Sequence, residues 1–146
     1  MKHEIIQYTT HRLIKSEDLN HHGTLYAGRG AEWFVESGFI AAAQILSPHN
    51  IICLKIHGMT FIKSVKAGET ICFNSRVVLA GKSSVKVYIK VVRENRNDII
   101  FDGFITFVHV DMDGNPIPHN LEIEAISVED RELQEIAKNF NPKKAK

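Results

Sequence analysis

Residues 18–46 read Asp-Leu-Asn-His-His-Gly-Thr-Leu-Tyr-Ala-Gly-Arg-Gly-Ala-Glu-Trp-Phe-Val-Glu-Ser-Gly-Phe-Ile-Ala-Ala-Ala-Gln-Ile-Leu and join a polar loop to an apolar helix. Apolar or small residues recur there at helical spacing: Ala31, Phe34, Val35, Gly38, Ala42 and Ile45. They predict a helix over residues 27–46, about 30 Å long at about 1.5 Å per residue, which Ser47-Pro48 would end. Because the helix is apolar on nearly every face from Trp33 onward, we expect it to lie at the centre of the domain.

Glu36 is the only formal charge between Trp33 and Leu46. An ionised carboxylate is costly to remove from water unless it finds partners. We therefore expect a buried Glu36 that acts as a general base or acid, or else forms a structural ion pair with a lysine of the sheet or of a partner subunit. Glu32 is a weaker candidate, because Arg29 lies three residues before it and can pair with it on the surface.

The apolar pattern changes from helical to alternating after the helix. In residues 84–94, for example, branched apolar residues alternate with Lys86, Tyr88 and Lys90, which predicts a strand with one dry and one wet face. The strands expected in the whole chain cover residues 4–15, 51–63, 69–80, 84–94 and 98–111. Short turns at 66–68, 80–82 and 95–97 join them, so neighbouring strands should be antiparallel.

A second helix is expected near the end of the chain. Ser127 and Asp130 have the spacing of a capping box, and apolar residues follow at helical intervals, which predicts a helix over about residues 128–140. The lysine-rich residues 141–146 should form a flexible tail. The pattern as a whole predicts one α+β domain over residues 1–146, in which a long antiparallel sheet wraps a central helix.

The composition is that of an ordinary globular protein of 146 residues. A net charge of +1 provides no field for nucleic-acid binding, and no apolar run approaches the roughly 18 residues that cross a bilayer. No leader-like segment is visible at the start, so we expect a cytoplasmic protein that binds neither nucleic acid nor membrane. Cys53 and Cys72 fall in strand-like runs and should be buried, free and inert thiols.

Motifs for other site classes are absent from the sequence. The eight histidines and two cysteines show no His-x-x-x-His or Cys-x-x-Cys spacing, so we expect no metal site. The chain also lacks a Gly-x-Ser-x-Gly elbow, a phosphate loop and a dinucleotide fingerprint. We accordingly predict no resident cofactor.

The start of the first helix is a candidate site for a partial negative charge. Free backbone N–H groups and the positive end of the helix dipole meet there, and Gly23, Gly28 and Gly30 allow a ligand to approach the backbone closely. The alternative is structural: Asn20 or Thr24 caps turns, and the glycines serve packing.

Two motifs resemble those of the hot-dog fold acyl-CoA thioesterases. The first is Asp18-x-Asn20-x-x-Gly23-Thr24-Leu-Tyr26-x-Gly28, followed by a helix with Trp33 and Ile40-Ala-Ala-Ala. The second is Ile56-His-Gly-Met-Thr-Phe-Ile-Lys63-x-Val65-x-x-Gly68-Glu69. The resemblance spans residues 12 to about 110, and it implies the same fold as the strand and helix pattern: a central helix wrapped by an antiparallel sheet.

The resemblance implies hydrolysis of an acyl-CoA thioester at a dimer interface, with coenzyme A as part of the substrate. A helix carboxylate would act opposite Asn20 of the partner subunit, and the amide of Gly28 would hold the thioester oxygen. The chain departs from the family because Val35 occupies the usual aspartate position, with Glu36 next to it, and because Ala27 replaces a glycine. In another branch of the superfamily the loop provides the acid, which makes Asp18 the alternative.

The coenzyme would be held by Lys63, which matches a basic residue of the family, and by Lys82, Ser83 and Ser84 of a hairpin turn. For Lys82 a solvated turn is the alternative. We expect a dimer or a multiple of dimers, because a single wrapped sheet leaves edge strands uncovered. A non-catalytic acyl-CoA or acyl-carrier-protein binding protein is the rival function. A hydratase on this fold is less favoured, because no Asp and His pair is placed for that chemistry.

Overall fold

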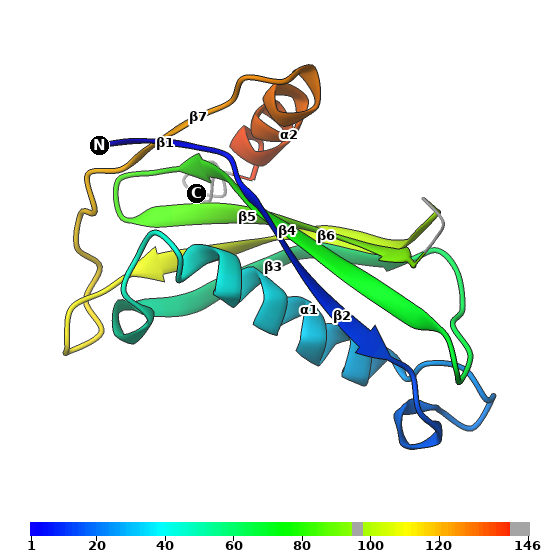
Figure 1. The fold of residues 1–146 in the computed structure, drawn as a ribbon. Coiled ribbons are helices and arrows are strands. Elements are labelled where there is room, and N and C mark those ends of the chain that lie inside the picture. The colour runs from blue at the N-terminus through cyan, green and yellow to red at the C-terminus, as the bar shows by residue number, and fades with distance from the viewer. Residues whose placement is uncertain (95–97, 141–146) are drawn as a thin grey trace.

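The computed structural model describes residues 1–94 and 98–140, which form a curved sheet with a helix on each side (Figure 1). Two α-helices are described, α1 (Ala27–Ala42) and α2 (Val128–Lys138), together with short 3-10 helices at Ser16–Asp18 and Pro48–Asn50. The strands are β1 (Lys2–Glu4), β2 (Gln7–Leu13), β3 (Ile51–Phe61), β4 (Thr70–Ala80), β5 (Ser84–Arg93), β6 (Ile99–His109) and β7 (Glu122–Glu124). Neither helix of the described residues is long and apolar enough to cross a membrane.

The main sheet has five antiparallel strands in the order β2-β4-β5-β6-β3. Strands β4, β5 and β6 follow one another in the sequence and in space, as their short connections predict. The chain then places β2 and β3 at the two edges, although they flank α1 in sequence. A small parallel pair, β1 with β7, joins the two ends of the chain outside this sheet.

Helix α1 packs across one face of the main sheet, and the largest apolar cluster lies between them. Trp33 and Phe34 on the helix are buried against Phe73 and Phe101 of the strands. Gly38 lets the helix approach closely, because an added Cβ would lie 3.1 Å from the side chain of Ile89. The expected helix at the centre of the fold is therefore confirmed.

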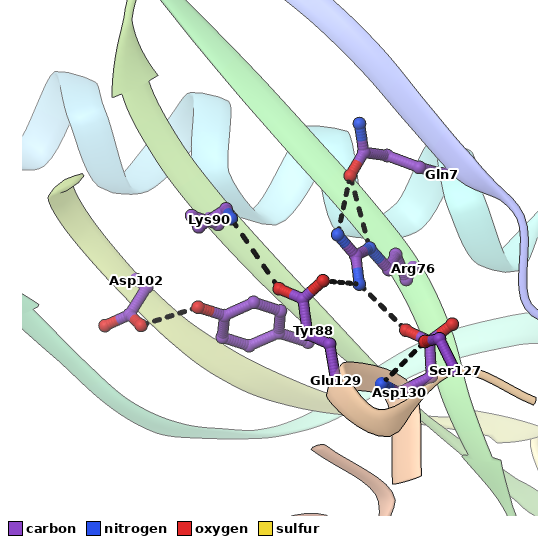
Figure 2. A network of polar contacts seen from close by, with 8 residues as sticks. All are labelled: Gln7, Arg76, Tyr88, Lys90, Asp102, Ser127, Glu129 and Asp130. Atoms are coloured by element: carbon purple, nitrogen blue, oxygen red, sulfur yellow. Dashed lines mark hydrogen bonds and ion pairs between the residues drawn. The ribbon is translucent and has the colours of Figure 1, made fainter. Parts of the chain in front are cut away.

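Helix α2 covers part of the opposite face. Leu133 and Ala137 pack with Val78, Tyr88 and Phe104 in a second apolar cluster. Polar contacts hold the start of the helix to the strands (Figure 2): Arg76 of β4 donates to Gln7 of β2 and to Asp130 of the helix. Within the sheet beside them, Tyr88 of β5 donates to Asp102 of β6. Ser127 caps the helix by accepting from the backbone N–H of Asp130 at 3.0 Å, as the capping spacing predicts.

Several expected boundaries were wrong in detail. Helix α1 ends at Ala42, because residues 43–46 form turns that lead to a short 3-10 helix. The single strand expected over 4–15 is two strands, since β1 pairs with β7 and only β2 joins the main sheet. Helix α2 ends at Lys138. The turn expected at 95–97 and the tail at 141–146 lie outside the described residues.

One of the two cysteines departs from the expectation. Cys72 is buried as predicted, but Cys53 is exposed, because no described residue pairs with the outer side of the edge strand β3. Both thiols are free.

Candidate active site

The loop between β2 and α1 is held in shape by Asn20. The backbone N–H groups of His22 and Thr24 donate to Asn20 Oδ1 at 2.8 and 3.2 Å, and the backbone N–H of Asn20 donates to the carbonyl of Thr24 at 2.7 Å. The turn-capping alternative is thus confirmed for the oxygen of this side chain. In the part of the chain that the structure describes, no acceptor is recorded for its Nδ2, so the amide group is available to a ligand.

Helix α1 begins without a side-chain cap. Its N-cap residue is Tyr26, whose side chain makes no capping hydrogen bond. Such a helix start leaves backbone N–H groups free to donate to an oxyanion or a polarised carbonyl. Gly28 lies in this first turn, and an added Cβ there would lie 2.5 Å from the ring of Tyr26. A side chain at position 28 would therefore displace Tyr26 from the helix start.

A cavity of about 350 Å³ opens beside this helix start. Asn20, Thr24 and Ala27 line it together with Phe61 at the end of β3, the residues 62–65 that follow this strand, and Ile100 and Phe101 of β6. The second sequence motif thus lies against the first, although 27 residues separate Gly28 from Ile56 along the chain.

Lys63 belongs to this cavity and is about half exposed. Its Nζ lies 3.4 Å from Asp98 Oδ2, and Arg93 donates to the same oxygen at 3.1 Å. Partial burial opposes ionisation of Asp98, but the hydrogen bonds from Lys63, its own backbone and Arg93 hold the pKa of that carboxyl below its usual value. Among the described residues, Lys63 is therefore a cation with one carboxylate partner, Asp98, at the edge of the candidate site.

Asp18 is 3% exposed and already has protein partners. The backbone N–H of Lys15 donates to its Oδ2 at 2.9 Å, and Arg29 Nε lies 3.5 Å from its Oδ1. These contacts join the end of β2 to the first turn of α1. Asp18 does not line the cavity at the helix start.

The expected burial of Glu36 was wrong for the single chain. Its side chain is 56% exposed, and Arg12 of β2 donates to its Oε1 at 2.5 Å. The guanidinium of Arg12 also lies 5.0 Å from the ring centroid of Trp33. The side chain escapes burial because position 36 faces the edge of the sheet, whereas Val35 beside it packs on the core. The expected surface pair of Arg29 with Glu32 is present at 4.0 Å.

Asn20, the uncapped start of α1 and Lys63 surround one cavity, and Glu36 lies further along α1. The family model of the thioesterase superfamily matches residues 22–100, more than half of the chain and all of these features except Asn20. The chain belongs to the thioesterase superfamily.

Individual relatives agree with this family. The chain is 28% identical over 105 residues to an uncharacterised acyl-CoA thioester hydrolase of Bacillus subtilis, a match that covers 69% of this chain and 60% of that one. It is 28% identical over 113 residues to an acyl-CoA thioester hydrolase of Salmonella typhimurium, with 73% and 84% covered. The match thus spans less than two thirds of the Bacillus relative.

Solved structures share the fold. An acyl-CoA hydrolase of Staphylococcus aureus, in complex with butyryl coenzyme A and coenzyme A, superposes with a TM-score of 0.80 at 21% identity, covering 91% of this chain and 80% of that one. A hexameric acyl-CoA thioesterase superposes with a TM-score of 0.81 at 25% identity, covering 91% and 86%. The predicted hot-dog fold is confirmed.

The Gly81–Ser84 turn of this thioesterase-superfamily chain lies far from Lys63. Val108 of β6 pairs with Ser84 on one side and with Ile52 on the other, so the turn lies level with the start of β3. Lys63 instead follows the opposite end of β3. The nine steps from Ile52 to Phe61 span about 30 Å at about 3.3 Å each. One chain therefore does not bring Lys63 together with Lys82, Ser83 and Ser84.

The turn borders a separate cavity of about 750 Å³ on the face that carries α2. Apolar residues such as Leu79 and Val108 line it together with Lys82, Lys86 and Lys138. Lys86 is only 7% exposed, and burial lowers the pKa of its amine. Sequence reasoning placed Lys86 on a wet strand face. The alternating pattern correctly separated Lys86 from the core-facing residues of β5, but it could not show that neighbouring elements cover this side chain.

Proposed function

We propose that this chain hydrolyses the thioester of an acyl-CoA to a free acid and coenzyme A. The observation that carries the proposal is the cavity at the uncapped start of α1, which is bounded by Asn20 and Lys63. Its free helix amides suit a polarised thioester oxygen, and Lys63 suits a phosphate. Relatives named as acyl-CoA thioester hydrolases, and a fold relative solved with butyryl coenzyme A, support the same substrate class.

The proposed mechanism uses a water molecule as the nucleophile. Asn20 positions the water molecule. The water oxygen attacks the thioester carbonyl carbon while the Glu36 carboxylate takes a proton from the water. The N–H of Gly28 donates to the oxyanion of the tetrahedral intermediate. When the intermediate collapses, the C–S bond breaks and the coenzyme thiolate recovers the proton from Glu36. Coenzyme A leaves as a product, so the reaction requires no resident cofactor.

This mechanism needs two copies of the chain. Glu36 lies eight residues after Gly28, which is about 12 Å along the helix at about 1.5 Å per residue. That span is too long for both groups of one chain to contact the same carbonyl, so the carboxylate of one subunit would act with the loop and helix start of another. The exposed carboxylate of Glu36 is accessible to such a partner.

Self-association is part of the proposal, as a dimer or a multiple of dimers. Fold relatives include hexameric thioesterases, among them one from Yersinia pestis. In such an assembly, coenzyme A bound by Lys63 of one subunit would also be bound by Lys82, Ser83 and Ser84 of another. We retain the predicted role of this turn in that form. The predicted cytoplasmic location remains a prediction.

Glu36→Gln is the test of the proposed base. This change retains the shape and removes the basicity, so turnover should fall by roughly 10²- to 10⁴-fold with the oligomer intact. The measurement is release of free thiol from acyl-CoA substrates of several chain lengths. Glu32→Gln removes the neighbouring exposed carboxylate and should leave turnover unchanged. Arg12→Met breaks the ion pair with Glu36 and reports how much of any loss comes from that pair alone.

Three outcomes would revise the proposal. Normal turnover in Glu36→Gln together with an inactive Asp18→Asn would make the loop acid the base. Equal losses in Arg12→Met and Glu36→Gln would make Glu36 a structural residue. Tight acyl-CoA binding without release of thiol, at any chain length, would select the rival function of an acyl-CoA or acyl-carrier-protein binding protein.

A further inference from the structure

Three potential metal-ligand atoms meet on the sheet, away from the candidate active site. They are His11 Nδ1 on β2, Cys72 Sγ on β4 and a carboxylate oxygen of Glu94, which directly follows β5. His11 and Cys72 are directly opposite each other in the β2–β4 pairing. The backbone N–H of Glu94 donates to the carbonyl of Thr70 at 3.0 Å, which holds the end of β5 beside them.

The three atoms are spaced like the donors of a tetrahedral zinc ion. His11 Nδ1 lies 3.3 Å from Cys72 Sγ and 3.4 Å from Glu94 Oε1, and all three lie within 4.8 Å of one another. With Zn–S at about 2.3 Å and Zn–N and Zn–O at about 2.0–2.1 Å, tetrahedral angles separate sulfur from nitrogen by about 3.6 Å and nitrogen from oxygen by about 3.4 Å. The two separations from His11 Nδ1 already lie within a few tenths of an ångström of these values, and rotation of the exposed Glu94 side chain can adjust the sulfur–oxygen separation.

Hydrogen bonds among the three side chains satisfy their polar atoms poorly. One ring nitrogen, His11 Nδ1, contacts both the sulfur and the carboxylate, but a single proton on it cannot make a good hydrogen bond to each. A divalent cation would interact with the nitrogen, the carboxylate and the sulfur at once, and would displace the thiol proton.

We propose that His11, Cys72 and Glu94 form a zinc-binding site with three protein ligands and an open position facing solvent. Thiolate, imidazole and carboxylate are the ligand types that Zn²⁺ takes in proteins. Cys72 is buried, whereas His11 and Glu94 are exposed, so the ion has a path of entry. The bound ion would connect the edge strand β2 to β4 and to the end of β5.

Cobalt spectroscopy tests this site directly. The full chain, freed of metal with a chelator, is titrated with Co²⁺ and then with Zn²⁺. We expect one Co²⁺ per chain, with a thiolate-to-cobalt charge-transfer band and intense tetrahedral ligand-field bands that Zn²⁺ abolishes. Cys72→Ser should remove the charge-transfer band. His11→Ala and Glu94→Gln should weaken Zn²⁺ binding by more than the roughly 10- to 100-fold cost of losing an outer-shell partner.

Cys53→Ser is the matched control, because Cys53 is the other free thiol and lies on β3. It should retain both the spectrum and the affinity. Cys72 is buried, so Cys72→Ser could impair folding. His11→Ala and Glu94→Gln change exposed side chains and therefore test the site even in that case. Absence of stoichiometric Co²⁺ binding, a charge-transfer band that survives in Cys72→Ser, or one lost in Cys53→Ser would overturn the proposal. Thiol release from acyl-CoA should be the same in all four variants, which separates this site from the proposed hydrolysis.

Discussion

At the scale of a single residue, the half-exposed cation of Lys63 is available to a substrate. Its only ion pair among the described residues is with Asp98, at 3.4 Å, and its side chain is 48% exposed. Exposed ion pairs contribute little to stability, so a coenzyme phosphate could replace Asp98 at small cost. Because the pKa of Asp98 is held low, the pair exists above that lowered pKa and is lost only as the pH falls through it.

Lys63→Ala should raise the KM for acyl-CoA much more than the KM for a short thioester that lacks the nucleotide. The physical reason is that lysine provides a point charge for phosphate, which only the first substrate carries. Steady-state kinetics with both substrates measure the difference. Lys66→Ala is the control, since Lys66 is also exposed and lies three residues away but outside the cavity. Equal effects of Lys63→Ala on both substrates would remove Lys63 from the coenzyme site.

At the scale of one element, α2 depends on a few polar contacts with the sheet (Figure 2). Arg76, 13% exposed on β4, donates to Asp130 at 2.8 Å and lies 3.3 Å from Glu129. The same guanidinium donates to Gln7 of β2, so one side chain connects two strands to the start of the helix. Apolar packing at Leu133 and Ala137 completes the contact.

Arg76→Met should lower the free energy of unfolding by about 1–3 kcal/mol, because hydrogen bonds to charged groups are lost and Asp130 retains only partial solvation. Urea unfolding measures the loss, and faster hydrogen exchange in residues 128–138 should locate it. Lys138→Met is the control. It removes an exposed pair with Glu135 and should change stability by no more than about 0.5 kcal/mol. Similar losses in both variants would contradict the role assigned to Arg76.

At the scale of the whole molecule, β3 is a long edge strand with apolar side chains in solvent. Ile52, Leu54 and Ile56 of this strand are all more than 40% exposed, and no described residue pairs with its outer side. Long apolar edges invite pairing with another chain, and natural proteins block such pairing with lysine. The edge therefore provides the surface on which the proposed assembly would form.

Ile56→Lys should convert the oligomer to monomers that remain folded, because the charge would be buried between paired edges. Sedimentation velocity at micromolar concentration measures the change. Thiol release should fall with it, since the proposed site needs two chains. Ile136→Lys places the same charge on the exposed side of α2 and should leave both unchanged. A wild-type chain that is a folded monomer at this concentration would exclude the shared site.

Features that depend on local pattern followed from the amino-acid sequence alone. Helical spacing predicted α1, alternation and short turns predicted the antiparallel order of β4, β5 and β6, and the capping spacing at Ser127 predicted α2. The two motifs around Asn20 and Lys63 also identified the family and one face of the candidate site. These features were predictable because each arises from residues that are close together in the chain.

The contacts that each side chain makes depend on the tertiary structure. Periodicity assigns a residue to a face, but its burial depends on the element that covers that face. Glu36 and Cys53 are therefore exposed near sheet edges, while Lys86 is buried. Strand pairing likewise brings His11 to Cys72 across 61 residues, which no spacing motif can report. Pairing and coverage are properties of contacts between distant segments, and a one-dimensional pattern does not contain them.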